Sequence, residues 1–261
     1  MQLLVSVRSA DEVGPALAGG ADIIDAKEPD RGSLGAVDRD VLSRILQRAP
    51  DDCKISVALG DVTRPEEVLA AVHGLELLQR AAPTYLKLGF AGVRSADQIG
   101  LLIEIAVSVT SGMPAPPHIV AVAYADPDRA GTVPPALIPS LAKAAGAAGA
   151  LLDTHGKDGR GLLEWVSPRA LRDWVAAARQ AGLLAALAGS LRPRDLAPVG
   201  RAQPDVVGVR GAACSGGRQG LVSEDRVRRF RLALDWAVRE TRDTGAISSV
   251  LAAAKSRKRK A

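Results

Sequence analysis

Short apolar runs alternate with amphipathic stretches along nearly the whole chain. The apolar runs have the length of β-strands and occupy residues 3–7, 23–26, 55–59, 85–88, 119–123, 150–153, 183–187 and 206–209. The segments between them show helical spacing of apolar residues, over residues 10–18, 39–48, 65–79, 96–109, 134–145, 168–180, 193–196 with a few neighbours, and 225–239. Strands separated by helices pair in parallel through right-handed crossovers. Eight such repeats predict an α/β fold, a single closed (β/α)8 TIM barrel, with a doubly wound open sheet as the alternative.

Length and composition agree with one large domain. The chain has 261 residues, 47% of them hydrophobic but only 3% aromatic. The core must therefore be built from Ala, Val, Leu and Ile, which suits barrel strands covered by closely packed helices. We expect a catalytic barrel at residues 1–240 and a C-terminal extension at residues 241–261.

The positive charge is concentrated at the C-terminus. The formal net charge is +5, and residues 255–260 contain five Lys and Arg side chains. This tail has no interleaved aromatic residues, so we interpret it as a disordered, solvated end and expect no nucleic-acid partner. A nucleic-acid-binding or protein-binding module that uses the tail is the alternative from another functional class.

The remaining composition favours a cytoplasmic protein. Cys53 and Cys214 are the only cysteines, too few for a disulfide framework. No apolar run approaches the roughly 20 residues that a membrane span requires, and the N-terminus enters a strand rather than a signal peptide. We therefore expect no membrane partner. The sequence does not determine the oligomeric state, and a homo-oligomer is compatible with it.

Charged residues stand at or near the carboxyl ends of the even-numbered strands. They are Lys27, Lys87, Asp153 and Arg210. In a barrel the side chains of alternate strands form a common layer, and the carboxyl ends form the face that carries the active site. We expect these four residues to meet there.

Lys27 and Lys87 are the candidate nucleophile and acid–base groups. Burial and neighbouring cations lower the pKa of an ammonium group, which leaves a neutral amine for attack on a carbonyl or for proton transfer. Asp25 lies two residues before Lys27 on the same face of the strand and can orient or protonate it. The alternatives are structural: an ion pair of Lys27 with Asp25, or of Lys87 with Asp25 or Asp153.

A glycine-punctuated loop, residues 153–161, follows the sixth strand. Asp153 is a candidate proton carrier, and Lys157 is placed to reach over the mouth of the barrel, although a plain surface charge is as good an interpretation of Lys157. His155 fits an acid–base role less well than an ordinary loop position. The three histidines are scattered, so the sequence predicts no metal site.

The loops after the last two strands predict an anion site. They carry Gly189, Ser190, Arg210, Gly211 and Ala212. Glycines let backbone amides approach an anion, and many barrels bind phosphate between loops seven and eight. Tight turns are the alternative explanation of the glycines. Cys214 has no partner that marks it as a nucleophile.

Four long motifs together resemble one family. They lie at residues 20–35, 152–159, 186–190 and 206–214 and contain the candidate residues above other than Lys87. The chain from Met1 to about Phe230 resembles the (5-formylfuran-3-yl)methyl phosphate synthase family, and the tail from about Thr241 lies outside that resemblance. The resemblance implies a β/α barrel and a lyase-type condensation without a metal or other cofactor. Two molecules of glyceraldehyde 3-phosphate combine to a furan aldehyde phosphate, with loss of phosphate and water, early in the synthesis of methanofuran-type one-carbon carriers.

The resemblance also implies residue roles. Lys27 is the lysine that forms the Schiff base, Lys87 is an acid–base residue, and Asp153 and Lys157 are further active-site groups. Amides of the loops after strands seven and eight would hold one phosphate, with Arg210 assisting, and Gly32 and Ser33 would meet the second. A class I aldolase for another sugar phosphate is an alternative. A decarboxylase-like barrel that uses the motif Asp25-x-Lys27-x-x-Asp30 with a cationic lysine is another.

Overall fold

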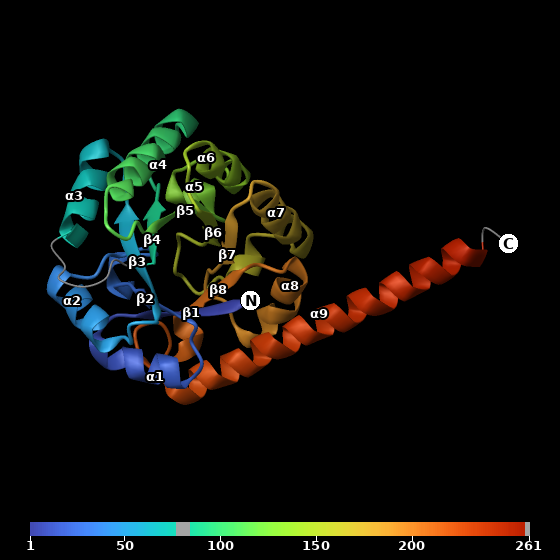
Figure 1. Cartoon of the computed structure of the whole chain (residues 1–261). Helices are drawn as coiled ribbons and strands as arrows, with labels where there is room; N and C mark the ends of the chain where they lie inside the picture. Colours follow the sequence, from blue (N-terminus) through green and yellow to red (C-terminus); the bar gives the residue numbers. More distant parts are fainter. Residues whose placement is uncertain (77–83, 259–261) are drawn as a thin grey trace.

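The computed structural model describes residues 1–76 and 84–258 and forms a closed barrel of eight parallel strands (Figure 1). The predicted TIM barrel is confirmed, and the open-sheet alternative is wrong because the first and last strands pair along their length. The strands are β1 (Gln2–Val7), β2 (Ile23–Ala26), β3 (Lys54–Asp61), β4 (Tyr85–Gly89), β5 (His118–Tyr124), β6 (Gly149–Asp153), β7 (Leu184–Leu187) and β8 (Val206–Val209).

Helices surround the barrel, as the alternating pattern predicts (Figure 1). They are α1 (Val13–Ala18), α2 (Arg39–Arg48), α3 (Pro65–Glu76), α4 (Ala96–Ser111), α5 (Pro127–Ala130), α6 (Ile138–Ala144), α7 (Pro168–Gln180), α8 (Leu196–Ala202) and α9 (Glu224–Lys258). The bounds predicted for α2 and α7 agree with the structure. The end predicted for α3, residues 77–79, lies outside the described residues.

Several short elements escape the sequence pattern. They are the 3-10 turns η1 (Ala10–Glu12), η2 (Pro29–Arg31), η3 (Pro135–Leu137), η4 (Leu162–Glu164), η5 (Pro193–Asp195) and η6 (Gly211–Ala213), and the two-stranded sheet of β9 (Cys214–Ser215) and β10 (Leu221–Val222). They are too short to show a period of hydrophobic residues. Most of them lie in loops after strands, where they shape the mouth of the barrel.

Local capping determines where some helices begin. The Ser95 hydroxyl accepts a hydrogen bond from the Gln98 amide at the start of α4, at 3.2 Å. The Ser167 hydroxyl accepts one from the Ala170 amide at the start of α7, also at 3.2 Å, and Pro168 follows at the first helical position. These residues satisfy amides that have no partner inside a helix, and proline at the first position has no amide to satisfy. The helices therefore begin where the sequence predicts.

Two apolar layers form the core. The larger one lies between the strands and the helices, and a smaller one fills the barrel interior with residues such as Ile23, Val120, Leu151 and Ala186. The interior side chains are mostly aliphatic, in keeping with the low aromatic content. This filling leaves room at the carboxyl ends of the strands, where polar side chains replace apolar ones.

The last helix differs from its prediction. The sequence predicts a helix over 225–239 followed by an extension with a disordered end, whereas α9 continues as one helix to Lys258 and projects away from the barrel (Figure 1). Its first turns bury Val227, Phe230 and Leu234. The sequence beyond them is rich in Ala, Lys and Arg and contains no proline, which favours continued helix. Residues 259–261 lie outside the described residues.

A membrane-spanning helix is not found within residues 1–76 and 84–258, because none there is both long enough and apolar enough to cross a bilayer.

Candidate active site

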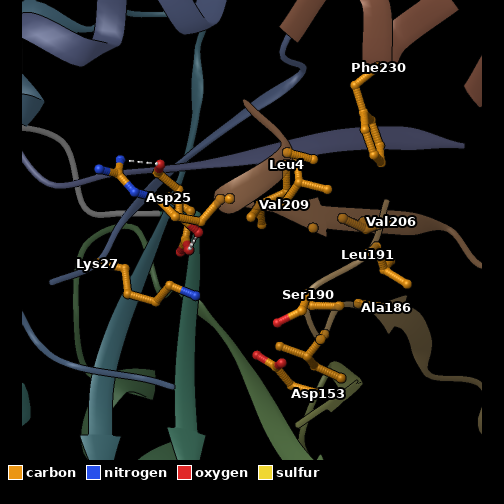
Figure 2. Close-up of a pocket in the computed structure, with 18 of the residues that line it drawn as sticks. Leu4, Asp25, Lys27, Asp153, Ala186, Ser190, Leu191, Val206, Val209 and Phe230 are labelled. Carbon is orange, nitrogen blue, oxygen red and sulfur yellow. Dashed lines mark hydrogen bonds between the residues drawn. The ribbon is translucent and has the colours of Figure 1, made fainter. Parts of the chain in front are cut away.

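A cavity of about 650 Å³ opens at the carboxyl ends of the strands and reaches into the barrel interior (Figure 2). Its floor is apolar, with Leu4 and Val206 among the lining residues. Most of its charged residues come from the ends of β2, β4 and β6 and from the loops after β7 and β8, and Ser6 of β1 and Ser56 of β3 add hydroxyls. The predicted candidates in its wall are Asp25, Lys27, Lys87, Asp153, Lys157, Gly189, Ser190, Arg210, Gly211 and Ala212.

Asp25 and Lys87 form an ion pair inside the barrel. Lys87 Nζ lies 2.6 Å from Asp25 Oδ1, and the Ser6 hydroxyl donates a hydrogen bond to Asp25 Oδ2 at 2.8 Å. Burial alone would raise the pKa of Asp25, but the charges of Lys87 and Lys27 outweigh it and hold the pKa below its usual value. Asp25 is therefore a carboxylate at neutral pH, and the structural alternative of an Asp25–Lys87 pair describes its resting state.

Lys27 is a buried lysine that forms no ion pair with any described residue. It is 7% exposed, and among the described residues no carboxylate oxygen lies within 4.0 Å of its amine. Figure 2 shows its amine pointing toward the side of the cavity that carries Ser190 and Asp153. Burial lowers the pKa of Lys27 from its usual 10.5 to about 7, and the cations of Lys87 and Lys157 act in the same direction against Asp153 and Asp25. A large fraction of Lys27 is therefore a neutral amine near pH 7.

Asp153 and Lys157 form the second ion pair of the cavity. Lys157 Nζ lies 2.9 Å from Asp153 Oδ1 and also donates to the Thr154 hydroxyl at 3.1 Å. Burial opposes the charge of Asp153, yet Lys157 and Lys27 outweigh it and lower its pKa. Lys157 is thus part of the site and not a free surface charge, and Lys27 has one ion pair on either side.

The loop after β7 carries two residues in the left-handed region. Gly189 has φ +100° and Ser190 has φ +51°. A Cβ on Gly189 would come within 3.3 Å of Thr154 and Leu162, so the positive φ favours glycine there and a side chain would also be crowded. Within the described residues, the amides of Gly189 and Ser190 donate to no protein acceptor. Both residues line the cavity, so two amides without a described protein acceptor lie at its wall.

Arg210 does not serve a phosphate as predicted. Its guanidinium pairs with the buried Glu12 at 2.5 and 3.0 Å and also donates to the carbonyls of Ser6, Arg218 and Gly220. Each of its N–H donors therefore has a protein acceptor. A guanidinium has five N–H donors, so none remains for a ligand. The Arg210 side chain ties the loop after β8 to the start of the chain.

Ser33 also has a different partner from the one predicted. It is buried outside the cavity wall, and its hydroxyl donates to the Tyr124 hydroxyl at 3.2 Å. Tyr124 in turn donates to Asp61 Oδ1 at 2.7 Å. Ser33 thus fastens the loop after β2 to β5 and is not available to a substrate phosphate in this conformation.

The contacts of His155 and of the neighbouring Asp126 are structural. Asp126 accepts the amides of His155 and Gly156 at 2.6 and 2.8 Å, which holds the loop that leads to Lys157. The His155 ring packs edge-on against Tyr124, with 5.2 Å between ring centroids. Among the described residues, no group of three or more His, Cys, Asp or Glu side chains is placed to hold a metal ion.

Sequence analysis missed several polar residues of the cavity wall, among them Ser6, Arg192 and Arg218. Ser6 had a signal, because it is a hydroxyl inside an otherwise apolar strand on the same face as Leu4. Arg192 and Arg218 lie in loops, where no periodicity indicates the direction of a side chain. Their participation depends on how the loops fold over the barrel.

Solved structures share this fold at low sequence identity. 3-Hexulose-6-phosphate synthase from Salmonella typhimurium is 15% identical, with a TM-score of 0.60, and the alignment covers 92% of this chain and all of that one, 100%. Phosphoribosylanthranilate isomerase from Thermotoga maritima is 13% identical, with a TM-score of 0.57, over 90% of this chain and 98% of the other. At such identities the likeness establishes the fold alone. The molecule is a TIM barrel with a lysine-rich cavity at the face where barrels carry active sites.

Sequence relatives define the family. The model of the 4-HFC-P synthase family matches residues 3–231. The (5-formylfuran-3-yl)methyl phosphate synthase of Methanothermobacter thermautotrophicus is 39% identical over 239 residues, which cover 90% of this chain and 99% of that protein. The protein of the same name from Methanocaldococcus jannaschii is 36% identical, over 88% of this chain and 98% of its own length. The chain belongs to the (5-formylfuran-3-yl)methyl phosphate synthase family, and the resemblance found in its motifs is confirmed.

Proposed function

We propose that this enzyme condenses two molecules of glyceraldehyde 3-phosphate, through a Schiff base on Lys27, to (5-formylfuran-3-yl)methyl phosphate with loss of one phosphate and of water. The reaction would make it a carbon–oxygen lyase acting on phosphates, at an early step of methanofuran-type cofactor synthesis. The observation that carries the proposal is the buried Lys27 amine, which has no ion-pair partner among the described residues and a pKa of about 7. Membership of the synthase family supports it.

Lys27 is the nucleophile of the proposed mechanism. Its neutral amine attacks the aldehyde carbon of one triose phosphate, and loss of water gives an iminium ion. The iminium withdraws electrons from the adjacent carbon, which then loses a proton to form an enamine. The enamine attacks the second aldehyde carbon and forms the carbon–carbon bond. Elimination of one phosphate, ring closure and dehydration complete the aromatic furan, and hydrolysis of the C=N bond by water releases the aldehyde product and restores the Lys27 amine.

The two ion pairs supply the proton transfers. Asp153 lies on one side of Lys27 as a carboxylate and accepts a proton from the substrate, while Lys157 lies 2.9 Å from it and can return one. On the other side, Lys87 donates from its contact with Asp25. Such positioned acid–base groups are typically worth about 100- to 10,000-fold in rate each. Without them, an imine could form but the later steps would stall.

The amides of the loops after β7 and β8 bind one substrate phosphate in this proposal. Gly189 and Ser190 offer N–H groups without protein acceptors in the described part of the chain, and Gly211 and Ala212 line the same cavity. A phosphate bound there would lie in the cavity that also holds the Lys27 amine. This arrangement agrees with the fold, in which phosphate sites often lie after the last two strands.

Trapping with borohydride tests the proposal. The enzyme is incubated with glyceraldehyde 3-phosphate and borohydride, and its intact mass and peptide map are measured. We expect a reduced triose-phosphate adduct on Lys27, none in Lys27→Ala, and the furan aldehyde phosphate when borohydride is omitted. Lys27→Arg keeps a positive charge but cannot form the imine, so it should lose turnover. Near-normal turnover of Lys27→Arg would eliminate the Schiff-base mechanism and favour a barrel in which Lys27 acts as a cation.

A further inference from the structure

Arg218 places a guanidinium in the cavity wall without a carboxylate partner. Its Nη2 donates to the carbonyls of Gly32 and Pro29, at 2.7 and 3.2 Å. No carboxylate oxygen of a described residue lies within 4.0 Å of it. Its Nη1 and Nε groups donate to no acceptor in the described residues, which leaves three N–H donors for a ligand. The other inward arginine of this loop, Arg210, has no donor left.

The path of the chain after β8 brings Arg218 to this position. Gly216 and Gly217 have φ of +84° and +80°, a pair of left-handed residues that reverses the chain toward the cavity. The Arg218 carbonyl accepts a hydrogen bond from Arg210 Nε at 3.1 Å, so the buried Glu12–Arg210 pair fixes its backbone. A Cβ on Gly211 would lie 3.5 Å from the Arg218 amide nitrogen. The backbone of Arg218 therefore lies beside the predicted phosphate loop, and its guanidinium reaches the loop that follows Lys27.

The charges around Arg218 favour an anion in front of it. Burial lowers the pKa of Arg218, and the nearby cation of Arg210 acts in the same direction. The charges of Asp153 and Asp30 raise this pKa, although neither carboxylate forms an ion pair with Arg218. Lowered or not, a guanidinium stays protonated at neutral pH. A partly buried cation without a counter-ion costs free energy, and a phosphate group would restore the balance with charge-assisted hydrogen bonds.

We propose that Arg218 binds the phosphate ester of the second triose phosphate, at a site between the loops after β8 and β2 that is separate from the amide site after β7. This inference rests on the proposed function, since a condensation of two phosphorylated aldehydes needs two anion sites beside one Lys27. Arg218 takes the place that sequence analysis gave to Ser33, whose hydroxyl is bonded to Tyr124. In this proposal the Nε and Nη1 groups of Arg218 donate hydrogen bonds to the substrate phosphate. Its Nη2 group holds the loop after Lys27 through the Gly32 carbonyl.

The site has a consequence for the order of events. A phosphate bound to Arg218 would connect the loop after β8 with the loop after β2. The loop after β2 follows the nucleophile, Lys27, in the sequence. The second aldehyde would then be presented to an enamine on Lys27 from a fixed direction. Loss of Arg218 should therefore weaken binding of the second substrate more than formation of the first imine.

The test uses Arg218→Gln in the full-length protein, with Arg169→Gln as the matched control. Arg169 lies on α7 with an 86% exposed side chain, so its change removes the same charge away from the cavity. Titration calorimetry with inorganic phosphate should find two sites in the wild-type and control proteins and one in Arg218→Gln. The KM for glyceraldehyde 3-phosphate should rise at least about tenfold, as expected for loss of hydrogen bonds between two charged groups. Trapping of the first triose phosphate on Lys27 by borohydride should remain.

Unchanged phosphate stoichiometry and unchanged KM in Arg218→Gln would overturn the inference, even if the enzyme makes the furan product. Conversely, a wild-type protein that makes no furan product, yet loses one phosphate site in Arg218→Gln, would retain the anion site and eliminate the proposed function. If Arg218→Gln does not fold, Arg218→Lys replaces it. A lysine keeps the charge but cannot hold Gly32 and a phosphate through a planar fork, so it should lose the same site. Retention of both sites in Arg218→Lys would contradict the proposal.

Discussion

Lys87 Nζ lies 2.6 Å from Asp25 Oδ1, in an ion pair whose side chains are 5% and 0% exposed. The two residues come from β4 and β2, which are not neighbours in the sheet, and they meet because alternate strands point into one layer of the barrel. Beside them, Lys27 has no such partner in the described part of the chain, and the Lys87 charge lowers its pKa. The Lys87 cation of this pair thus helps to lower the pKa of Lys27, while Asp25 acts in the opposite direction.

The first prediction concerns the pH dependence of imine formation. Since the pKa of Lys27 is about 7, the fraction of neutral amine rises with pH through that value. The rate of borohydride-trapped adduct formation should rise from pH 6 to pH 8 with a midpoint near 7. A profile that is flat over this range, or that falls with rising pH, would contradict the role of a neutral Lys27.

The free energy of unfolding should also depend on pH through the lowered pKa of Lys27. The unfolded state binds a proton at Lys27 up to about pH 10.4, whereas the folded state has released it above about 7, so the stability contribution of this group rises with pH between these values. At pH 7 the burial of the Lys27 amine therefore destabilises the folded state, and Lys27→Met removes this destabilisation. It should raise the melting temperature at pH 7 by at least about 2 °C, and the gain should shrink toward pH 10. An equal gain at both pH values would assign the effect to packing.

Replacement of Lys87 should separate imine formation from turnover. In Lys87→Met the Schiff base still forms on Lys27, but product formation falls by about 100-fold or more because an acid–base group is lost. The midpoint of the pH profile should also move upward, because loss of the Lys87 cation raises the pKa of Lys27. Lys143→Met, at an exposed lysine of α6, is the control and should change neither value. Unchanged turnover in Lys87→Met would give Lys87 a structural role only.

The buried Glu12–Arg210 pair should stabilise the folded protein, and the Arg210 side chain should not bind a phosphate. Both side chains are 2% exposed, so Glu12→Gln leaves a buried guanidinium without its counter-ion. A loss of about 3–5 kcal/mol is expected, and for a domain of this size the melting temperature should fall by about 10 °C. Asp40→Asn, which breaks the exposed pair with Arg44, is the control and should cost less than about 1 kcal/mol. Equal losses in the two variants would refute the assignment.

The basic tail should be dispensable for the reaction. The cavity lies within the barrel, and its lining residues end at Phe230. Deletion of residues 257–260 should leave kcat and KM for glyceraldehyde 3-phosphate within about twofold of the full-length values, a difference well below 1 kcal/mol. If turnover disappears while the melting temperature is unchanged, the tail takes part in the principal function and the binding-module alternative gains support.

The sequence alone determined the barrel and the positions of Asp25, Lys27, Lys87 and Asp153 at its mouth. Strand length, the alternation of strands with helices, and the two-residue period of side chains are local properties that can be counted along the chain. Once eight parallel strands are inferred, closure brings the even-numbered strands into one layer. The sequence left the ion pair of Asp25 with Lys87 as one of several alternatives, because it does not give distances across the barrel.

Only the tertiary structure decided the partners in the loops. Arg210 and Ser33 look like phosphate ligands in sequence, yet one pairs with Glu12 and the other with Tyr124, residues far away along the chain. Arg218, without any signal of its own, lies in the cavity because two left-handed glycines and the Arg210 side chain direct its backbone there. Side chains in loops have no period to follow, so packing between distant segments decides which of them reach the ligand.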